Sequence, residues 1–168
     1  MKATASPKMY LAVVGPSSPD ERILQLAEAV GAEVARAGAV LLTGGREGAM
    51  AAASRGAHNA GGLTIGILPG SSREEANPFV DLSIPTGMGE MRNALLIRSA
   101  DGVVAVGGGV GTLSEIALAL KLGKPLVGLE TWKAVVGPKG DNVVPTAATP
   151  EEAVARIIAA VSGAKASG

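Results

Sequence analysis

The stretch GVVAVGGGVGT, at residues 102–112, decides how this chain folds. Its first five residues form a continuous apolar run that predicts a buried strand, and the apolar residues that follow the glycines predict a helix. A strand, a glycine-rich turn and a helix in this order present backbone N–H groups and a helix N-terminus to an anion. We therefore predict a phosphate site in this turn. Its expected binding residues are Gly107, Gly108, Gly109, Gly111 and Thr112.

Two common glycine signatures do not match this turn. A Walker loop ends in Gly-Lys-Ser/Thr, a triplet that the sequence lacks. The dinucleotide pattern G-x-G-x-x-G would need a glycine at position 112 or 114, which are Thr and Ser, and it usually follows the first strand. The prediction is therefore a phosphate-bearing small molecule bound outside the standard NAD and NTP modes. A tight turn that binds nothing is the alternative.

Outward from this turn, apolar runs alternate with helical stretches along the whole chain. Apolar runs this continuous suit strands covered on both faces, which means a parallel sheet. Strands are expected at 9–14, 39–43, 63–68, 80–84, 102–106 and 125–129, with a further short one near 143–144. Helices are expected at 19–37, 48–60, 89–100, 111–122 and 150–162. The pattern predicts a single α/β domain over residues 1–168. Its expected fold is Rossmann-like and doubly wound, with a mostly parallel sheet of about six or seven strands and helices on both faces.

Three of the expected helices begin with the same signal. Ser or Thr is followed three residues later by Glu, which is the pattern of a capping box. These pairs are Ser18 and Glu21, Thr112 and Glu115, and Thr149 and Glu152.

A second glycine turn, TGGREG at 43–48, follows the second expected strand and also opens a helix. The carboxyl ends of parallel strands lie at one edge of a sheet, so we expect the two turns to form two walls of one cleft. Gly44 and Gly45 are the expected ligand contacts in this second turn. Arg46 and Glu47 are either ligand or subunit contacts or a solvated pair.

Arg92 and Glu115 are expected at the same edge, because each falls in the first turn of a helix that follows a strand-end loop. An Arg there can clamp phosphate in a bidentate way, and a carboxylate can bind sugar hydroxyls or stabilise an oxocarbenium ion. The alternatives are local. Glu115 would serve as the third residue of a capping box, and Arg92 as a solvated first-turn residue.

Composition narrows the classes of function. The 15 Lys and Arg residues balance the 15 Asp and Glu residues, which argues against a nucleic-acid or membrane-surface partner. The absence of Cys excludes disulfides and thiolate zinc sites, and a single His excludes a multi-His metal centre, so we expect no metal site. We also expect no cofactor. No apolar stretch is long enough for a signal peptide or a bilayer span, so we expect a cytoplasmic protein.

Several blocks resemble one known family. They are MGEMR at 88–92, Asp101 and GGVGTLSE at 108–115, with TGGREGAM at 43–50 and IGILPG at 65–70. Together they resemble the LOG ("lonely guy") cytokinin-activating phosphoribohydrolases over roughly residues 9–130. The resemblance implies that Arg92 and Glu115 match the catalytic pair and that Gly108, Gly109, Gly111 and Thr112 match the phosphate-binding loop. The implied reaction hydrolyses the N-glycosidic bond of a nucleoside 5′-monophosphate, releasing the base and ribose 5-phosphate.

Two positions depart from the LOG pattern. Gly107 stands where the family has Pro, and Asn93 stands where it has Lys. This combination is more similar to the molybdenum cofactor carrier branch of the same SLOG superfamily, which implies binding of a phosphate-bearing pterin without cleavage. The older lysine decarboxylase label of the family finds no support. That chemistry needs a Lys that forms a Schiff base with pyridoxal phosphate, and no Lys lies at an expected strand-end turn facing the cleft.

The expected helix at 111–122 is apolar almost all round. A helix of this kind tends to be buried on every side, so we expect a homodimer that packs it, together with the helix at 89–100, against a second copy. The resemblance also implies a dimer.

Three further sets of residues are given no catalytic role. His58 is expected to be exposed or to cap a helix, and Asp81 and Asp101 to lie at strand starts away from the cleft. Trp132 and Phe79 either stack on a planar ligand or serve packing or an interface.

The sequence thus favours a small-molecule binding protein in which Arg92 clamps the phosphate and Glu115 holds a ring or sugar donor. The alternative is the phosphoribohydrolase, in which Glu115 stabilises the ribosyl centre. A third hypothesis is a dimeric domain whose cleft serves regulation or a partner protein.

Overall fold

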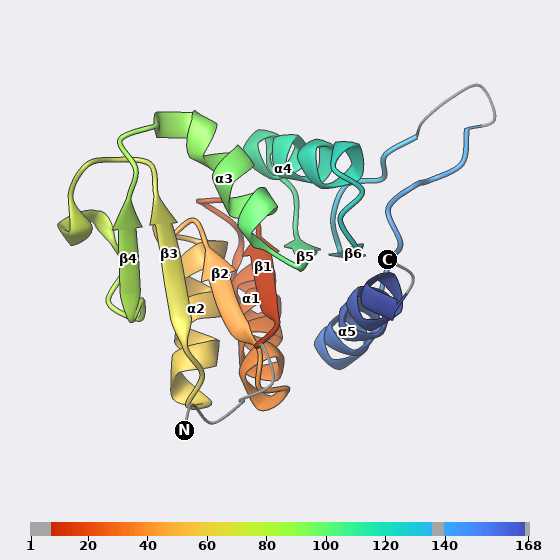
Figure 1. Ribbon diagram of the computed structural model, residues 1–168, viewed down its shortest axis with the longest axis horizontal. Coiled ribbons are helices and arrows are strands. Elements are labelled where there is room, and N and C mark those ends of the chain that lie inside the picture. Colours follow the sequence, from red (N-terminus) through yellow and green to blue (C-terminus); the bar gives the residue numbers. More distant parts are fainter. Residues whose placement is uncertain (1–7, 136–139, 167–168) are drawn as a thin grey trace.

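A computed structural model describes residues 8–135 and 140–166 of the chain (Figure 1). Its six strands form one sheet in the order β4-β3-β2-β1-β5-β6, and all five pairings are parallel. The predicted parallel sheet is therefore confirmed. The strands are β1 (Tyr10–Val14), β2 (Val40–Thr43), β3 (Thr64–Leu68), β4 (Leu82–Pro85), β5 (Gly102–Val106) and β6 (Leu126–Leu129).

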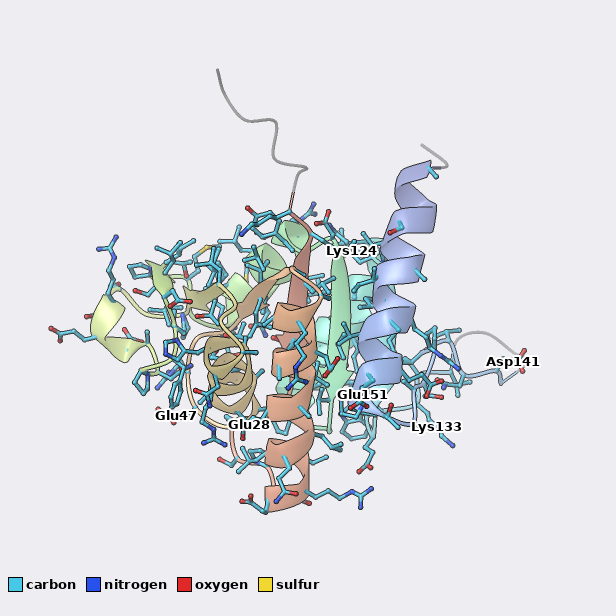
Figure 2. All side chains as sticks on the ribbon, turned by 90° about the horizontal axis from the view of Figure 1, so that it is seen from below. Glu28, Glu47, Lys124, Lys133, Asp141 and Glu151 are labelled. Atoms are coloured by element: carbon cyan, nitrogen blue, oxygen red, sulfur yellow. The ribbon has the colours of Figure 1, made fainter. Side chains whose placement is uncertain are left out.

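Helices cover both faces of this sheet, as a doubly wound α/β fold requires (Figures 1 and 2). α1 (Glu21–Arg36), α2 (Ala49–Asn59) and α5 (Pro150–Ala166) pack on one face. α3 (Arg92–Ser99) and α4 (Val110–Lys121) pack on the other. Two short 3₁₀ turns, η1 (Arg73–Glu75) and η2 (Gly89–Met91), complete the described elements.

The central strand β1 shows why the apolar runs are continuous. Leu11 and Val13 belong to the core beneath α1, α2 and α5, whereas Ala12 and Val14 belong to the core beneath α3 and α4. A strand buried on both faces has no polar side, so its sequence does not alternate.

β1 also marks the point at which the strand order reverses. It pairs with β2 on one side and with β5 on the other, and the chain crosses between these sides only after β4. Loops that leave neighbouring strands in opposite directions open a crevice at their carboxyl ends, where ligands bind in folds of this class.

The sequence misplaced three elements. Residues 143–144 form no strand, because this part of the chain makes only isolated bridges, Val135 with Asn142 and Gly128 with Thr146. The strand expected at 80–84 is β4 at Leu82–Pro85. The helix expected at 89–100 begins as the 3₁₀ turn η2, so α3 starts only at Arg92.

Two of the three predicted capping boxes are wrong. α1 is capped by Asp20, whose side chain accepts the Ile23 N–H at 2.9 Å, rather than by Ser18. α4 begins at Val110 after Gly109 and has no side-chain cap, so Thr112 lies inside the first turn and does not precede the helix.

The third capping box, that of Thr149 and Glu152, is confirmed by its main contact, the hydrogen bond to the Thr149 hydroxyl. The Thr149 hydroxyl accepts the Glu152 N–H at 3.2 Å, and the Glu152 carboxylate reaches back to the Ala148 N–H at 2.7 Å.

α1 and α2 approach each other through glycine. A Cβ on Gly31 of α1 would lie 2.7 Å from the carbonyl carbon of Ala53, and a Cβ on Gly56 of α2 would lie 2.8 Å from that of Glu28. Both distances are shorter than any van der Waals contact, so the two backbones touch at these positions. Among the described residues, no helix is long and apolar enough to cross a membrane.

Candidate functional site

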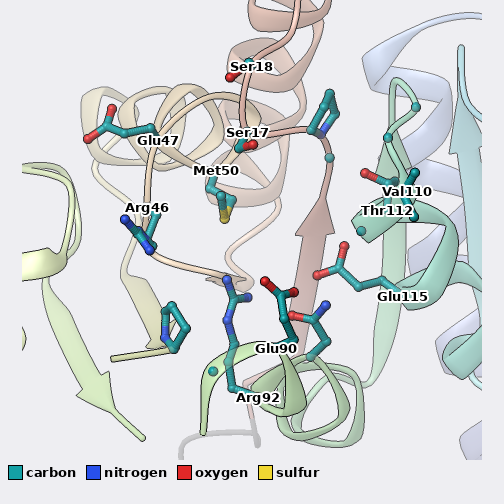
Figure 3. A pocket seen from close by; sticks show the side chains of 18 residues that line it. Ser17, Ser18, Arg46, Glu47, Met50, Glu90, Arg92, Val110, Thr112 and Glu115 are labelled. Atoms are coloured by element: carbon teal, nitrogen blue, oxygen red, sulfur yellow. The ribbon is translucent and has the colours of Figure 1, made fainter. Parts of the chain in front are cut away.

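A cavity of about 760 Å³ lies at the carboxyl edge of the sheet, around the crevice between β1 and β5 (Figure 3). Its size is typical of small-molecule sites. The loops after β1, β2 and β5 form its walls, together with η2 and the first turn of α3. It is lined by Gly15, Pro16, Ser17, Ser18, Arg46, Glu47, Met50, Pro69, Gly89, Glu90, Arg92, Asn93, Gly108, Gly109, Val110, Gly111, Thr112 and Glu115.

The glycine turn after β5 presents unused hydrogen-bond donors to this cavity. Within the described parts of the chain, the backbone N–H groups of Val110, Gly111 and Thr112 have no acceptor, because the first bond of the helix is donated by Leu113 to Gly109. The Thr112 hydroxyl is also buried, with no hydrogen-bond partner among the residues that the structure describes. Three N–H groups at a helix N-terminus and a buried hydroxyl form a suitable environment for an anion.

Gly111 differs from the other glycines of this turn. A Cβ on Gly111 would meet nothing within 4 Å, and its backbone is helical with no positive φ. Protein packing therefore does not require glycine at this position. Because Gly111 lines the cavity without a side chain, there is room for a ligand close to its backbone.

Arg92 forms the opposite wall at the start of α3. Its side chain is only 8% exposed, and its guanidinium lies against Gly44, where a Cβ would overlap both terminal nitrogens. The Nε and Nη1 atoms have no hydrogen-bond partner among the described residues. Burial lowers the pKa of Arg92, and the negative charges of Glu115 and Glu90 oppose this change. A buried guanidinium with unused donors favours an anionic ligand beside it.

Glu115 faces the same space from the second turn of α4 (Figure 3). Its side chain is 7% exposed. Burial raises the pKa of its carboxyl to about 7, while the charge of Arg92 partly opposes this rise and that of Glu90 adds to it. Such a carboxyl exchanges its proton near neutral pH, so it can donate or accept a hydrogen bond from a ligand.

Of the predicted site residues, the structure brings Arg92, Glu115, Gly108, Gly109, Gly111 and Thr112 together around the cavity. Gly44, Gly45 and Gly107 do not line it. Gly44 supports the Arg92 guanidinium. Gly45 and Gly107 have φ angles of 76° and 67° and shape their turns, with the Gly107 N–H donating to Leu129.

The second glycine turn contributes side chains to the cavity, not an open helix end. The first N–H of α2, at Ala49, donates to the carbonyl of Pro16, and a Cβ on Gly48 would overlap the loop after β1. This helix N-terminus is therefore partly occupied by protein. Arg46, Glu47 and Met50 are the residues of this segment that reach the cavity.

Sequence reasoning named no site residue in the loop after β1, which supplies Pro16, Ser17 and Ser18. The signal was present, since a serine pair follows the first strand after Gly15 and Pro16. The capping pattern from Ser18 to Glu21 instead predicts a helix start at this point. Glu90 was also missed as a cavity residue, because the 3₁₀ turn η2 determines where it faces.

The residues given local roles lie outside the cavity. His58 is half-exposed, with its Nδ1 3.8 Å from Asp81 Oδ1, and its ring lies 6.1 Å from that of Phe79. Asp81 and Asp101 accept backbone N–H groups at the starts of strands, from Thr64 and Tyr10 respectively, both at 2.8 Å.

Comparison with known proteins finds relatives over most of the chain. The chain is 38% identical to the molybdenum cofactor binding protein of Rippkaea orientalis, with a TM-score of 0.84 over 94% of this chain and 99% of that one. It is 37% identical to the molybdenum cofactor carrier protein of Chlamydomonas reinhardtii, with a TM-score of 0.80 over 93% and 99% of the two chains. It is also 34% identical to a cytokinin riboside 5′-monophosphate phosphoribohydrolase of Mycobacterium tuberculosis, over 73% of this chain and 71% of that protein.

The resemblance to LOG-like proteins, and to their cofactor carrier branch, is therefore confirmed over most of the chain. The family model that matches covers residues 8–154, which include every strand and every residue of the cavity. This protein belongs to the SLOG cluster4 family.

Proposed function

We propose that this protein binds a phosphate-bearing small molecule, either a pterin or a nucleotide-like compound, in the manner of the molybdenum cofactor carrier proteins. The observation that carries the proposal is the set of unused donors at the start of α4, namely three backbone N–H groups and the buried Thr112 hydroxyl. The phosphate occupies this end of the cavity. Arg92 binds a second oxygen-rich part of the ligand from the opposite wall.

The strength of such binding is easily accounted for. An anion at a partly buried helix N-terminus gains up to about 2 kcal/mol. Charge-assisted hydrogen bonds add about 1.5–3 kcal/mol each. A few of these together reach about −8 kcal/mol, which corresponds to micromolar affinity. The geometry therefore supports reversible binding without any reacting group.

The second candidate function is hydrolysis of a nucleoside 5′-monophosphate at the N-glycosidic bond. The observation that favours it is the position of Glu115, a buried carboxyl with a pKa of about 7 that shares the cavity with Arg92. A carboxylate at this place stabilises an oxocarbenium-like ribosyl centre.

One incubation separates the two functions. The protein is incubated with AMP, and free adenine is measured by chromatography beside a Glu115→Ala control. Adenine release that depends on Glu115 establishes the phosphoribohydrolase. Binding of AMP or of a pterin phosphate by calorimetry, without release of base, supports the carrier.

Replacing Arg92 tests the clamp. We expect Arg92→Ala to weaken binding of the phosphate ligand by roughly ten-fold or more, since one charge-assisted contact is lost. The matched control is Arg98→Ala, which removes the same charge from the exposed end of α3 and should leave affinity unchanged. Equal calorimetric affinities for both variants and the wild type would remove Arg92 from the site.

We also propose that two copies of the chain associate through α3 and α4. On these helices and the preceding turn η2, large apolar side chains remain exposed. Met91 is 71% exposed, Leu95 38%, Val110 84% and Leu113 37%. Exposed apolar side chains grouped on neighbouring elements favour an interface.

A further inference from the structure

Trp132 contacts the glycine turn from outside the cavity. The loop that follows β6 carries the indole beside this turn, where its Nε1–H donates to the Gly109 carbonyl at 3.1 Å. The ring also covers Gly108, since a Cβ there would lie 3.1 Å from Nε1 and 3.4 Å from Cε2. Gly108 and Gly109 line the cavity, whereas Trp132 does not. The indole therefore supports the turn on the side away from the ligand.

The bonded carbonyl controls the direction of a ligand-facing donor. Gly109 is the N-cap residue of α4, and its carbonyl also accepts the Leu113 N–H at 2.9 Å. In a trans peptide, the carbonyl of one residue and the N–H of the next point in opposite directions. A bond that fixes the Gly109 carbonyl therefore also fixes the Val110 N–H, which is one of the unused donors of the site.

Trp132 is itself held by a neighbouring contact. Two residues before it, the Glu130 carboxylate accepts the Arg22 Nε–H at 2.9 Å and pairs with Arg22 Nη2, which ties the end of β6 to α1. Glu130 has a φ of 50°, a left-handed value that non-glycine residues rarely adopt. Such a conformation persists only where surrounding contacts determine it. The loop thus contacts both α1 and the glycine turn.

We infer that Trp132 is a positioning residue for the anion site, because it orients the Val110 N–H group through the Gly109 carbonyl. This inference rests on the proposed binding of phosphate at the start of α4. Trp132 is the only Trp of the chain, so its indole N–H gives a single resonance in a ¹⁵N spectrum.

The first experiment titrates ¹⁵N-labelled protein with AMP and follows two sets of signals. The backbone amides of Gly108 to Thr112 report whether AMP binds, and the indole N–H of Trp132 reports whether the support responds. We expect both to shift along the same saturation curve. If the amides shift while the indole does not, the positioning role is overturned and the proposed function stands. If no signal shifts, AMP binding fails, and the ligand-free comparison below then decides the role of Trp132.

The second experiment uses Trp132→Phe, which keeps an aromatic ring but removes the N–H donor. We expect AMP affinity to fall roughly five-fold, the effect of one lost hydrogen bond. Phe79→Leu, which alters an aromatic residue outside the cavity, is the control and should keep wild-type affinity.

The Phe variant also tests the inference without ligand. A general loss of stability would leave the fast backbone motion of one turn unchanged, so the readout is the ¹⁵N order parameter of Val110 and Gly111. We expect both values to fall in Trp132→Phe while those of α5 stay constant. Unchanged order parameters at Val110 and Gly111 would overturn the positioning role whether or not AMP binds.

Discussion

At the scale of single residues, Glu115 makes the cavity sensitive to pH. Its carboxyl has a pKa of about 7 in the folded protein against an ordinary value of 4.5. Between these values the folded state binds more protons than the unfolded state, so the free energy of unfolding falls as the pH rises. A change from 4.5 to about 7 corresponds to about 3 kcal/mol.

Glu115→Gln cannot ionise and should escape this loss. We expect urea unfolding in the absence of ligand to show the variant gaining up to about 3 kcal/mol on the wild type between pH 4.5 and 8. Most of the gain should appear below pH 7. Stability profiles that stay parallel across this range would show that Glu115 ionises freely in the folded protein.

A substitution at Gly111 should have opposite effects on the stability of the fold and on ligand affinity. Since a Cβ there meets nothing and the backbone is helical, Gly111→Ala should stabilise the fold by up to about 1 kcal/mol. The added methyl group lies on the cavity wall and should weaken ligand binding roughly ten-fold, or about 1.4 kcal/mol.

The matched control is Gly163→Ala in α5, where a Cβ also meets nothing. It should raise the melting temperature and leave affinity unchanged. Gly111→Ala with wild-type affinity would show that ligands do not approach this wall.

At the scale of elements, the contact between α1 and α2 depends on the absence of side chains. A Cβ on Gly31 would lie 2.7 Å from the carbonyl carbon of Ala53, and backbone atoms cannot move aside as a flexible side chain can. Gly31→Ala should therefore destabilise the protein by about 1–3 kcal/mol, although Ala is the better helix former. The free energy of unfolding of Gly31→Ala is measured by chemical denaturation and compared with that of Gly163→Ala. An equal gain in both variants would mean that the two helices separate easily.

The same scale shows which elements the sequence predicts well. Buried strands such as β5 were predicted to the residue, because a continuous apolar run of five residues ends at a glycine. Helix starts were less reliable, since Ser18 and Thr112 match the capping pattern as well as Thr149 does. Asp20 caps α1 in place of Ser18, which lies in the loop that lines the cavity.

At the scale of the whole molecule, the site was only partly predictable. Arg92, Glu115 and the glycine turn follow from their positions after strand ends and from the family resemblance. The supporting contact of Trp132 could not be predicted, since it depends on how the loop after β6 packs against the glycine turn. The contact of Gly44 with the Arg92 guanidinium could not be predicted either, because it joins two segments that are distant in the sequence.

Association of two copies is tested at this scale. We expect light scattering at micromolar concentration to give about twice the chain mass of 16.6 kDa. Leu95→Glu, on the exposed face of α3, should yield monomers because a charge cannot be buried in an apolar interface without a partner. Leu63→Glu, at a similarly exposed leucine before β3, is the control. A wild-type mass near 16.6 kDa would exclude the dimer.

The place of β1 between β2 and β5 has a consequence for how the protein is made. Tyr10 at the start of β1 binds Asp101 just before β5, and these residues are 91 positions apart. A ribosome adds about 5–20 residues per second. The edge of β1 that pairs with β5 therefore stays unpaired for at least several seconds, until β5 has been synthesised. During that time the nascent chain exposes an apolar strand edge. An unpaired strand edge can pair with other chains, so this interval is when the new chain is most open to aggregation.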